Sequence, residues 1–238
     1  LPISLEETAA FFDYLWNHDA PLVLTGAMRS AGQVGADGPA NLLDASRVAL
    51  AKNSRRRGVQ VVMGAEIHHG TTVRKTDSLA LQAFSSPMVG PSGMLLEGTV
   101  HYLREPPRRK PLPLPQQTSQ EIALLESTLS ADSLLLENIL ELGYDGLVIA
   151  GFGAGHVSEK WADAVEKIAK KIPVIIATRT GSGPTAQSSY GFIGSEMDLI
   201  RRGAVMAGFL CPRKARILLW LLVGGGRQDD LGVFLAQD

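Results

Sequence analysis

The sequence predicts an α/β protein with two domains, each a mostly parallel sheet flanked by helices. Short, largely apolar segments alternate with helical segments in both halves of the chain, at residues 22–25, 59–63, 147–150 and 174–177. Strands that are apolar on both faces are typical of parallel sheets covered by helices on both sides. Each half therefore reads as a βαβ arrangement, whose crossover should be right-handed.

A change in composition separates the two halves. Residues 104–117 are rich in proline, with arginine and lysine between the prolines. Such a segment forms neither a helix nor a central strand. A polyproline docking motif is the alternative interpretation, but a linker between two folded halves is more economical. We therefore expect domains at residues 1–103 and 118–238.

The overall composition excludes several classes of partner. The 238 residues are 45% hydrophobic and carry 23 basic and 24 acidic side chains, so electrostatics give no reason to expect nucleic acid or an anionic membrane as a partner. Cys211 is the single cysteine, which excludes an intrachain disulfide and a cysteine-based metal site. The apolar run at residues 217–223 is too short to span a bilayer. The compartment stays open: the cytoplasm is favoured, and a periplasmic or secreted location would follow if a signal segment preceded Leu1.

The first half begins with a helix and a βαβ unit. Ser4 and Glu7 are spaced as a capping box for the first helix. After the strand at residues 22–25 we expect a second helix over residues 39–51 and a second strand at 59–63. The predicted core side chains of the second helix are Leu42, Leu43, Ser46 and Leu50.

The loop after the first strand is a candidate ligand site. The strand stops at Thr25-Gly26, passes through small residues and restarts as a helix, for which Asp37 is the predicted N-cap and Pro39 a first-turn residue. Open α/β sheets bind their ligands at the carboxyl ends of their strands. From spacing alone, an ordinary connection between strand and helix remains the simpler reading.

The remainder of the first half is expected to form short strands and hairpins. Residues 65–70 read as a hairpin tip with His68 and His69 on a solvated turn, and we expect no metal there. Residues 72–77 read as a short strand entering a loop, and residues 87–102 as a hairpin. Lys75 could act as a base if it were buried, although a surface position is the simpler interpretation.

The second half predicts another alternation of strands and helices. Its helices are expected at residues 131–142, 158–171, 212–223 and 229–236. The glycine-rich loop at 151–155 does not have the Gly-x-Gly-x-x-Gly spacing of a dinucleotide site. We therefore expect a loop that shapes a pocket, with His156 at its rim, and no cofactor.

Ordered motifs along the chain resemble the bacterial-type L-asparaginase family. They are Gly-Ala-Met-Arg at 26–29, Asp-Gly-Pro-Ala-Asn-Leu at 37–42, Arg-Gly-Val-Gln-Val-Val-Met at 57–63, Lys-Thr-Asp at 75–77, Gly-Tyr-Asp-Gly-Leu-Val at 143–148, the loop at 151–156, Arg-Thr-Gly-Ser-Gly at 179–183 and Pro-Arg-Lys-Ala-Arg-Ile-Leu-Leu at 212–219. The resemblance covers essentially the whole chain. It implies a two-domain α/β fold, assembly as a homodimer or homotetramer, and hydrolysis of L-asparagine, often also of L-glutamine, through a threonine nucleophile.

The resemblance also implies that the threonines of this chemistry lie outside the chain. The family carries one in a Thr-Gly-Gly-Thr-Ile motif and another in a His-Gly-Thr-Asp-Thr motif, which precedes a helix beginning Leu-Glu-Glu-Thr-Ala. That helix matches residues 5–9, but Pro2 and Ile3 stand where threonine and aspartate are expected. We therefore expect an incomplete first domain and an inactive chain. The alternative is a non-catalytic or decayed amide-binding homologue.

The resemblance assigns roles to four side chains. Lys75 matches the catalytic lysine that helps to deprotonate the threonine. Ala27 is expected against the substrate amide. His156 and Glu196 are expected to bind substrate, in some members from a neighbouring subunit. No metal and no cofactor are implied.

Overall fold

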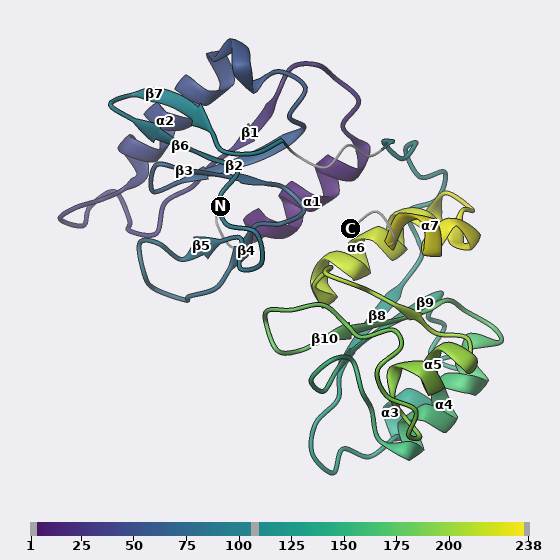
Figure 1. Cartoon of the computed structure of the whole chain (residues 1–238). Coiled ribbons are helices and arrows are strands. Elements are labelled where there is room, and N and C mark those ends of the chain that lie inside the picture. The colour runs from purple at the N-terminus through teal and green to yellow at the C-terminus, as the bar shows by residue number, and fades with distance from the viewer. Residues whose placement is uncertain (1–3, 106–109, 236–238) are drawn as a thin grey trace. The chain divides into compact units, whose positions relative to one another are not determined.

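The computed structural model describes residues 4–105 and 110–235 of the chain (Figure 1). It divides into two compact units, Leu1–Pro111 and Leu112–Asp238. Each unit contains a β-sheet with helices packed against it, so the predicted two-domain α/β class is confirmed. Among the described residues, no helix combines the length and the apolar character needed to cross a membrane.

The first unit is built on a five-stranded mixed sheet. Its elements are α1 (Leu5–Leu15), β1 (Leu22–Leu24), α2 (Gly38–Leu50), the 3₁₀ helix η2 (Lys52–Ser54), β2 (Val59–Met63), β3 (Glu66–His69), β4 (Arg74–Lys75), β5 (Phe84–Ser85), β6 (Gly93–Leu96) and β7 (Thr99–Tyr102). The strand order is β1-β2-β3-β6-β7, and β4 pairs separately with β5. Only β1 and β2 are parallel; the other neighbours in the sheet are antiparallel.

The prediction of a mostly parallel sheet is therefore wrong for this unit, and two tight turns explain why. Gly64 and Ala65 connect β2 to β3 with φ values of 58° and 63°, and Glu97 and Gly98 connect β6 to β7 with φ values of 50° and 76°. Two consecutive left-handed residues are the backbone of the type I′ turn, which matches the twist of antiparallel strands. These turns return the chain directly and leave no room for a crossover helix.

The two faces of strand β2 support two separate cores. Val59 and Val61 pack with Ala9 of α1, whereas Val62 packs with Ala45 and other side chains of α2. This alternation places α1 and α2 on opposite faces of the sheet (Figure 1).

The predicted core face of α2 is wrong. Leu42, Leu43 and Leu50 are 63%, 52% and 85% exposed, and Ser46 is exposed too. The buried residues are Asn41, Ala45 and Val48 instead, at the spacing i, i+4, i+7. Hydrophobic periodicity placed the leucines inside because it assigns every polar residue to the solvent face. Asn41 is polar and yet buried, so the true buried face was missed.

The predicted helix caps at Ser4 and Asp37 are also absent, because neither side chain bonds to a backbone N–H at its own helix start. The Ser4 hydroxyl lies 3.3 Å from the Thr8 hydroxyl. Asp37 turns back towards the preceding loop. His68 and His69, expected on a solvated turn, are buried on β3.

The second unit has the parallel sheet that the sequence predicts. Its elements are β8 (Ile122–Glu126), α3 (Leu134–Glu137), β9 (Gly146–Gly151), α4 (Glu159–Ala169), β10 (Val174–Thr178), α5 (Glu196–Arg201), β11 (Val205–Met206), α6 (Pro212–Gly224), the 3₁₀ helix η3 (Gln228–Asp230) and α7 (Leu231–Leu235). The strand order is β11-β10-β9-β8, with every neighbouring pair parallel. Helices α3, α4 and α5 lie on one side of this sheet and α6 on the other (Figure 1).

Two details of the second unit differ from expectation. The helix predicted at residues 131–142 is reduced to α3, because i→i+3 hydrogen bonds such as Ile139 N–H to Leu136 C=O tighten the chain into turns up to Gly143. Helix α5 and strand β11 had no counterpart in the prediction. The last predicted helix extends to residue 236, and that residue lies outside the described part of the chain.

Candidate functional site

The loop that follows β1 is held by a carboxylate beneath it. We call residues 26–29 the Ala27 loop. The Asp37 carboxylate accepts hydrogen bonds from the Met28 N–H, at 2.9 and 3.0 Å from its two oxygens, and from the Arg29 N–H at 2.8 Å. Burial raises the pKa of Asp37, but these hydrogen bonds and one from Asn41 outweigh it, so the pKa lies below its ordinary value. Asp37 is therefore held as an anion.

The side-chain amide of Asn41 connects this loop to the sheet. Its Nδ2 donates to the Gly26 carbonyl at 3.0 Å and to the Asp37 carboxylate at 2.9 Å, and its Oδ1 accepts from the Gly64 N–H at 3.0 Å. Asn41 is only 3% exposed. The end of β1 is thus fixed to the turn after β2. The sequence alone had indicated only that Asn41 lies in a helix.

Ala27 lies between two backbone groups that are both bonded. Gly26 contributes its carbonyl to Asn41, and Met28 contributes its N–H to Asp37. Within residues 4–105 and 110–235, neither the N–H nor the C=O of Ala27 forms a hydrogen bond. The two peptide groups that flank Ala27 are therefore fixed in place through Gly26 and Met28, while the half-buried Ala27 keeps its own N–H donor and C=O acceptor unbonded.

Lys75 is anchored to the start of the first helix. It lies on β4 opposite Phe84, and its backbone N–H donates to the Glu6 carboxylate at 2.7 Å. Its ammonium nitrogen is 5.9 Å from the centre of the Phe84 ring. Glu6 lies in the first turn of α1. The half-buried Lys75 is thus fixed beside the segment that immediately follows residues 1–4.

In the second unit the structure brings His156 and Glu196 together. The His156 Nε2 lies 3.1 Å from one Glu196 carboxylate oxygen. The other oxygen accepts hydrogen bonds from the Ser189 and Tyr190 N–H groups, each at 2.6 Å. Glu196 is fully buried, whereas the His156 side chain is 19% exposed. Of these two side chains, only His156 is accessible from outside as the unit stands.

Hydrogen bonds also keep Glu196 ionised. Burial raises its pKa, but the bonds from backbone N–H groups and from His156 outweigh that effect and hold the pKa below its ordinary value. The rings of Tyr190 and Phe192 each meet the His156 ring edge-on, with centroids 5.1 Å apart. Glu196 thus fixes both the imidazole and the aromatic loop around it.

The glycine-rich loop before His156 is fixed from two sides. The Thr178 hydroxyl donates to the Gly153 carbonyl at 2.5 Å. Gly155 has a φ of 103°, and a Cβ there would come within 2.9 Å of Met206 and 3.0 Å of Thr185. The loop is therefore closely packed, and His156 follows it directly.

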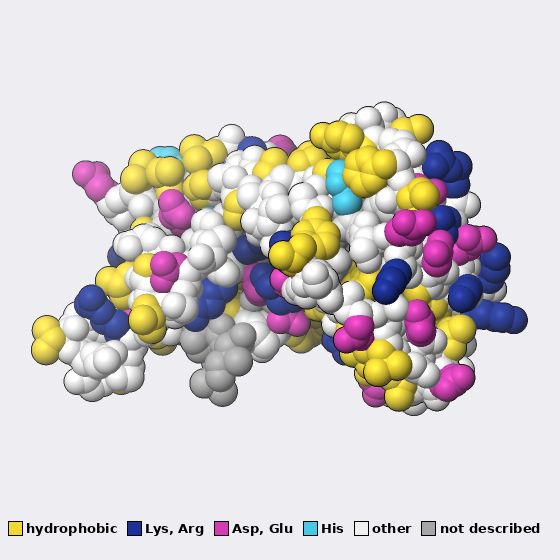
Figure 2. Space-filling view, turned by 90° about the horizontal axis from the view of Figure 1, so that it is seen from below, with side chains coloured by type: hydrophobic (Ala, Val, Ile, Leu, Met, Phe, Trp, Pro, Cys, Tyr) yellow, Lys and Arg dark blue, Asp and Glu magenta, His cyan; other side chains and the backbone are white. Residues whose placement is uncertain are grey.

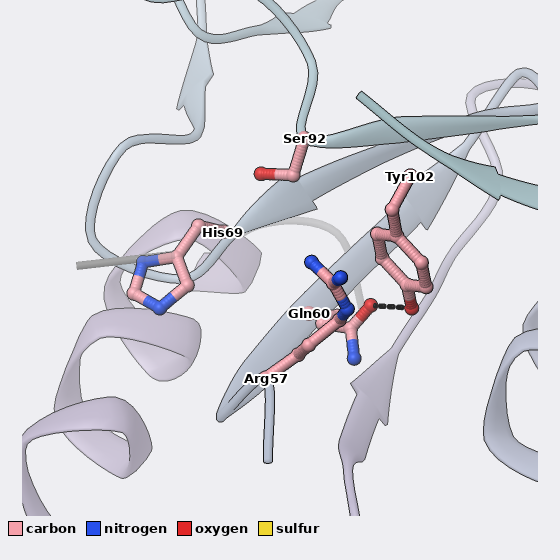
Figure 3. Close-up of a pocket in the computed structure, with 5 residues that line it drawn as sticks. All are labelled: Arg57, Gln60, His69, Ser92 and Tyr102. Atoms are coloured by element: carbon pink, nitrogen blue, oxygen red, sulfur yellow. Dashed lines mark hydrogen bonds between the residues drawn. The ribbon is translucent and has the colours of Figure 1, made fainter. Parts of the chain in front are cut away.

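A small polar cavity lies elsewhere in the first unit. Arg57, Gln60, His69, Ser92 and Tyr102 line it, with the Tyr102 hydroxyl donating to Gln60 at 2.5 Å (Figure 3). It includes neither Ala27 nor Lys75.

In the described residues, no three His, Cys, Asp or Glu side chains are grouped so that they could hold a metal ion. On the face of the molecule seen in Figure 2, charged side chains of both signs are interspersed.

Asp37, Asn41 and Glu6 are the functional candidates that sequence reasoning missed. A signal for the first two was present: Asp37 and Asn41 are four residues apart at a helix start, so their side chains can lie on one face. No comparable signal linked Glu6 to Lys75, because the two are 69 positions apart in the chain.

Comparison with known proteins gives the family. The model described as "Asparaginase, N-terminal" matches residues 4–108, and that described as "Glutaminase/Asparaginase C-terminal domain" matches residues 121–231. Similar curated proteins include "Probable L-asparaginase periplasmic" of Haemophilus influenzae, 36% identical over 92% of this chain and 62% of the relative. "Probable L-asparaginase" of Deinococcus radiodurans is 37% identical over 97% of this chain and 72% of the relative. "L-asparaginase 2" of Escherichia coli is 34% identical over 92% of this chain and 63% of the relative.

The chain therefore spans 62–72% of the length of these three relatives. The two matched regions correspond to the two units of the structure and together cover most of the chain. With both family domains present in order, and with this level of identity, the chain belongs to the asparaginase family.

Proposed function

We propose that this chain serves the hydrolysis of a side-chain amide, taking L-asparagine, and L-glutamine as a second substrate, to the acid and ammonia. The named relatives and the glutaminase/asparaginase family models support this reaction class. In this proposal the Ala27 loop binds the substrate amide, and Lys75 assists deprotonation of a threonine nucleophile. His156 contacts substrate from the second unit of a neighbouring copy in a homodimer or homotetramer.

The hydrogen bond between Lys75 and Glu6 carries the proposal. In the family that this chain resembles, the helix beginning Leu-Glu-Glu-Thr-Ala directly follows a threonine motif. Glu6 lies in that helix here, and its carboxylate holds the Lys75 backbone at 2.7 Å. This bond fixes the Lys75 backbone to the first turn of that helix and so supports the proposed role, in which the lysine reaches a hydroxyl supplied by the preceding threonine motif.

Glu196 has a positioning role in this proposal. Its side chain is fully buried and its two oxygens are occupied by Ser189, Tyr190 and His156. It therefore acts on substrate through His156 and the loop at 189–190.

We further propose that the 238-residue chain by itself does not hydrolyse L-asparagine or L-glutamine. Residues 1–238 contain no Thr-Gly-Gly-Thr-Ile motif, and Pro2 and Ile3 occupy the positions of the second threonine and its aspartate. Lys75 then lacks the threonine hydroxyl that the proposed reaction assigns to it. A non-catalytic amide-binding homologue would share this property.

Ammonia release from L-asparagine and L-glutamine tests the proposal, with the Lys75→Ala chain as the matched control. We expect equal background release from both chains and saturable binding of L-asparagine by each. Release that Lys75→Ala abolishes would overturn the proposed inactivity and support the reaction. An absence of both release and binding would overturn the proposed amide site.

The sequence of the gene upstream of Leu1 separates the enzyme from the binding homologue. In-frame threonine motifs there, with Lys75-dependent turnover by the longer product, would support the enzyme. A start codon at that point would support the amide-binding homologue. Light scattering after size-exclusion chromatography tests the assembly, with a dimer or tetramer expected and a monomer contradicting it.

A further inference from the structure

The backbone N–H and C=O of Ala27 belong to two successive peptide groups, and both groups are held by hydrogen bonds of the adjacent residues. Its own N–H and C=O have no hydrogen-bond partner in the described parts of the chain, while Gly26 is bonded to the buried Asn41 side chain and Met28 to the half-buried Asp37 side chain. A carboxamide offers both N–H donors and a carbonyl acceptor. It is therefore the hydrogen-bonding complement of this unbonded C=O and N–H.

Asn41 can serve the loop in only one orientation. Its Nδ2 faces two acceptors, the Gly26 carbonyl at 3.0 Å and the Asp37 carboxylate at 2.9 Å, and its Oδ1 faces the Gly64 N–H at 3.0 Å. Both N–H groups and the oxygen of the side chain are thus used. A carboxylate at this position would place an acceptor against two acceptors.

Asp37 holds the two residues that follow Ala27 in the chain. One carboxylate accepts the two successive N–H groups of Met28 and Arg29, at 2.8–3.0 Å, and also the Asn41 amide. Hydrogen bonds to an ionised acceptor are about twice as strong as neutral ones. The chain direction after Ala27 is therefore set by Asp37, and that before it by Asn41.

We propose that Asp37 and Asn41 are positioning residues, which hold the Ala27 peptide where it binds the carboxamide of the ligand. The inference rests on the proposed function for the nature of the ligand, and on the hydrogen bonds alone for the holding of the loop. Asn41 is buried in the row that also contains Ala45 and Val48, where an apolar side chain would pack without polar cost. Its hydrogen bonds to the loop explain why an amide occupies that place.

The test compares Asp37→Asn and Asn41→Asp in the full chain. Asp44→Asn is the matched control, because Asp44 lies on the same helix and pairs with Arg47 without touching the loop. Amide hydrogen exchange reports the loop, and titration with L-asparagine reports the ligand. In both loop variants we expect exchange at Met28 to become about tenfold faster and binding of L-asparagine to become about tenfold weaker, the size of one lost hydrogen bond to a charged group. The control should leave both unchanged.

The double variant Asp37→Asn/Asn41→Asp separates positioning from simple stabilisation. It retains a carboxylate and an amide side by side, but turns an acceptor towards the Gly26 carbonyl. We expect thermal stability to recover in part and L-asparagine binding to remain weak. Recovery of binding together with stability would overturn the positioning role.

Failure of this inference can be distinguished from failure of the proposed function. A wild-type chain without affinity for L-asparagine would overturn the proposed function and the ligand part of the inference together. If L-asparagine binds and neither single variant weakens it, the proposed function stands and the inference is overturned. Wild-type exchange at Met28 as fast as at Ala27 would overturn the holding of the loop.

Discussion

Replacing Glu196 by alanine should destabilise the second unit by about 3 kcal/mol, because hydrogen bonds to a buried charged group contribute about 1.5–3 kcal/mol each. One of its oxygens accepts the Ser189 and Tyr190 N–H groups at 2.6 Å each, and the other lies 3.1 Å from His156. The side chain is fully buried, so no solvent replaces it after truncation without a rearrangement of the loop.

Glu196→Gln gives a graded comparison. Its amide oxygen can still accept both backbone N–H groups, and its NH₂ can face a neutral imidazole, so only the charge is lost. We expect a loss of about 1 kcal/mol, the size of the charge contribution to such bonds. The order of stability should be wild type, then Gln, then Ala.

Urea unfolding followed by tryptophan fluorescence measures these differences. The chain has three tryptophans, and a Trp16→Phe background leaves Trp161 and Trp220, both of which lie in the second unit. Glu141→Ala is the control, since Glu141 is exposed. If both Glu196 variants unfold within 0.5 kcal/mol of their parent, about the effect of a surface substitution, the assigned role of Glu196 is refuted.

Three further predictions concern the remaining structure. Arg202→Met removes ion pairs at 2.8–3.2 Å to Asp163 and Glu166 of α4 and to Asp198 of α5, and should lower the unfolding free energy in urea by about 2 kcal/mol. Gly151→Ala would place a Cβ within 2.8 Å of the His156 backbone, and should cost about 1–3 kcal/mol and shift the His156 resonances in NMR spectra. The pKa values of Asp37 and Glu196 lie below their ordinary values in the folded chain, so their stabilisation is present at neutral pH and is lost on acidification. Urea titrations should therefore show stability falling below about pH 4.

Strands that are buried on both faces could be predicted, because a short run of apolar residues marks them in the sequence. β2, which is apolar apart from Gln60, and β9 are buried along their whole length and form where the sequence predicts them. The hairpin predicted at residues 87–102 contains β6 and β7 and is confirmed. The antiparallel pairing of β2 with β3 could not be read in the same way, because it depends on turn conformation at Gly64-Ala65, which is not an Asn-Gly or Asp-Gly sequence, the strongest signal for a hairpin turn.

Polar side chains inside the protein account for most of the missed features. Hydrophobic periodicity gave α2 the wrong face, since Asn41 rather than Leu42 turns inwards to bond the loop. His68 and His69 read as a surface turn and are buried instead, with hydroxyl partners at Ser86 and Thr71. Such partners come from distant or irregular segments, which residue spacing does not reveal.

The candidate site was predictable only in part. The resemblance supplied Ala27, Lys75, His156 and Glu196, and the structure shows what holds each of them. Glu196 occupies a helix that the pattern did not predict, and its burial could be recognised only from the packed unit. The roles of all four remain proposals about chemistry.

Titration of the isotope-labelled chain with L-asparagine tests the central claim most directly. We expect saturable changes of the Ala27 and Met28 amide resonances, with glycine, which lacks the side-chain amide, producing none. These changes should be lost in the Asn41→Asp chain. Saturable binding that leaves the Ala27 loop unchanged, or no binding at all, would contradict the account.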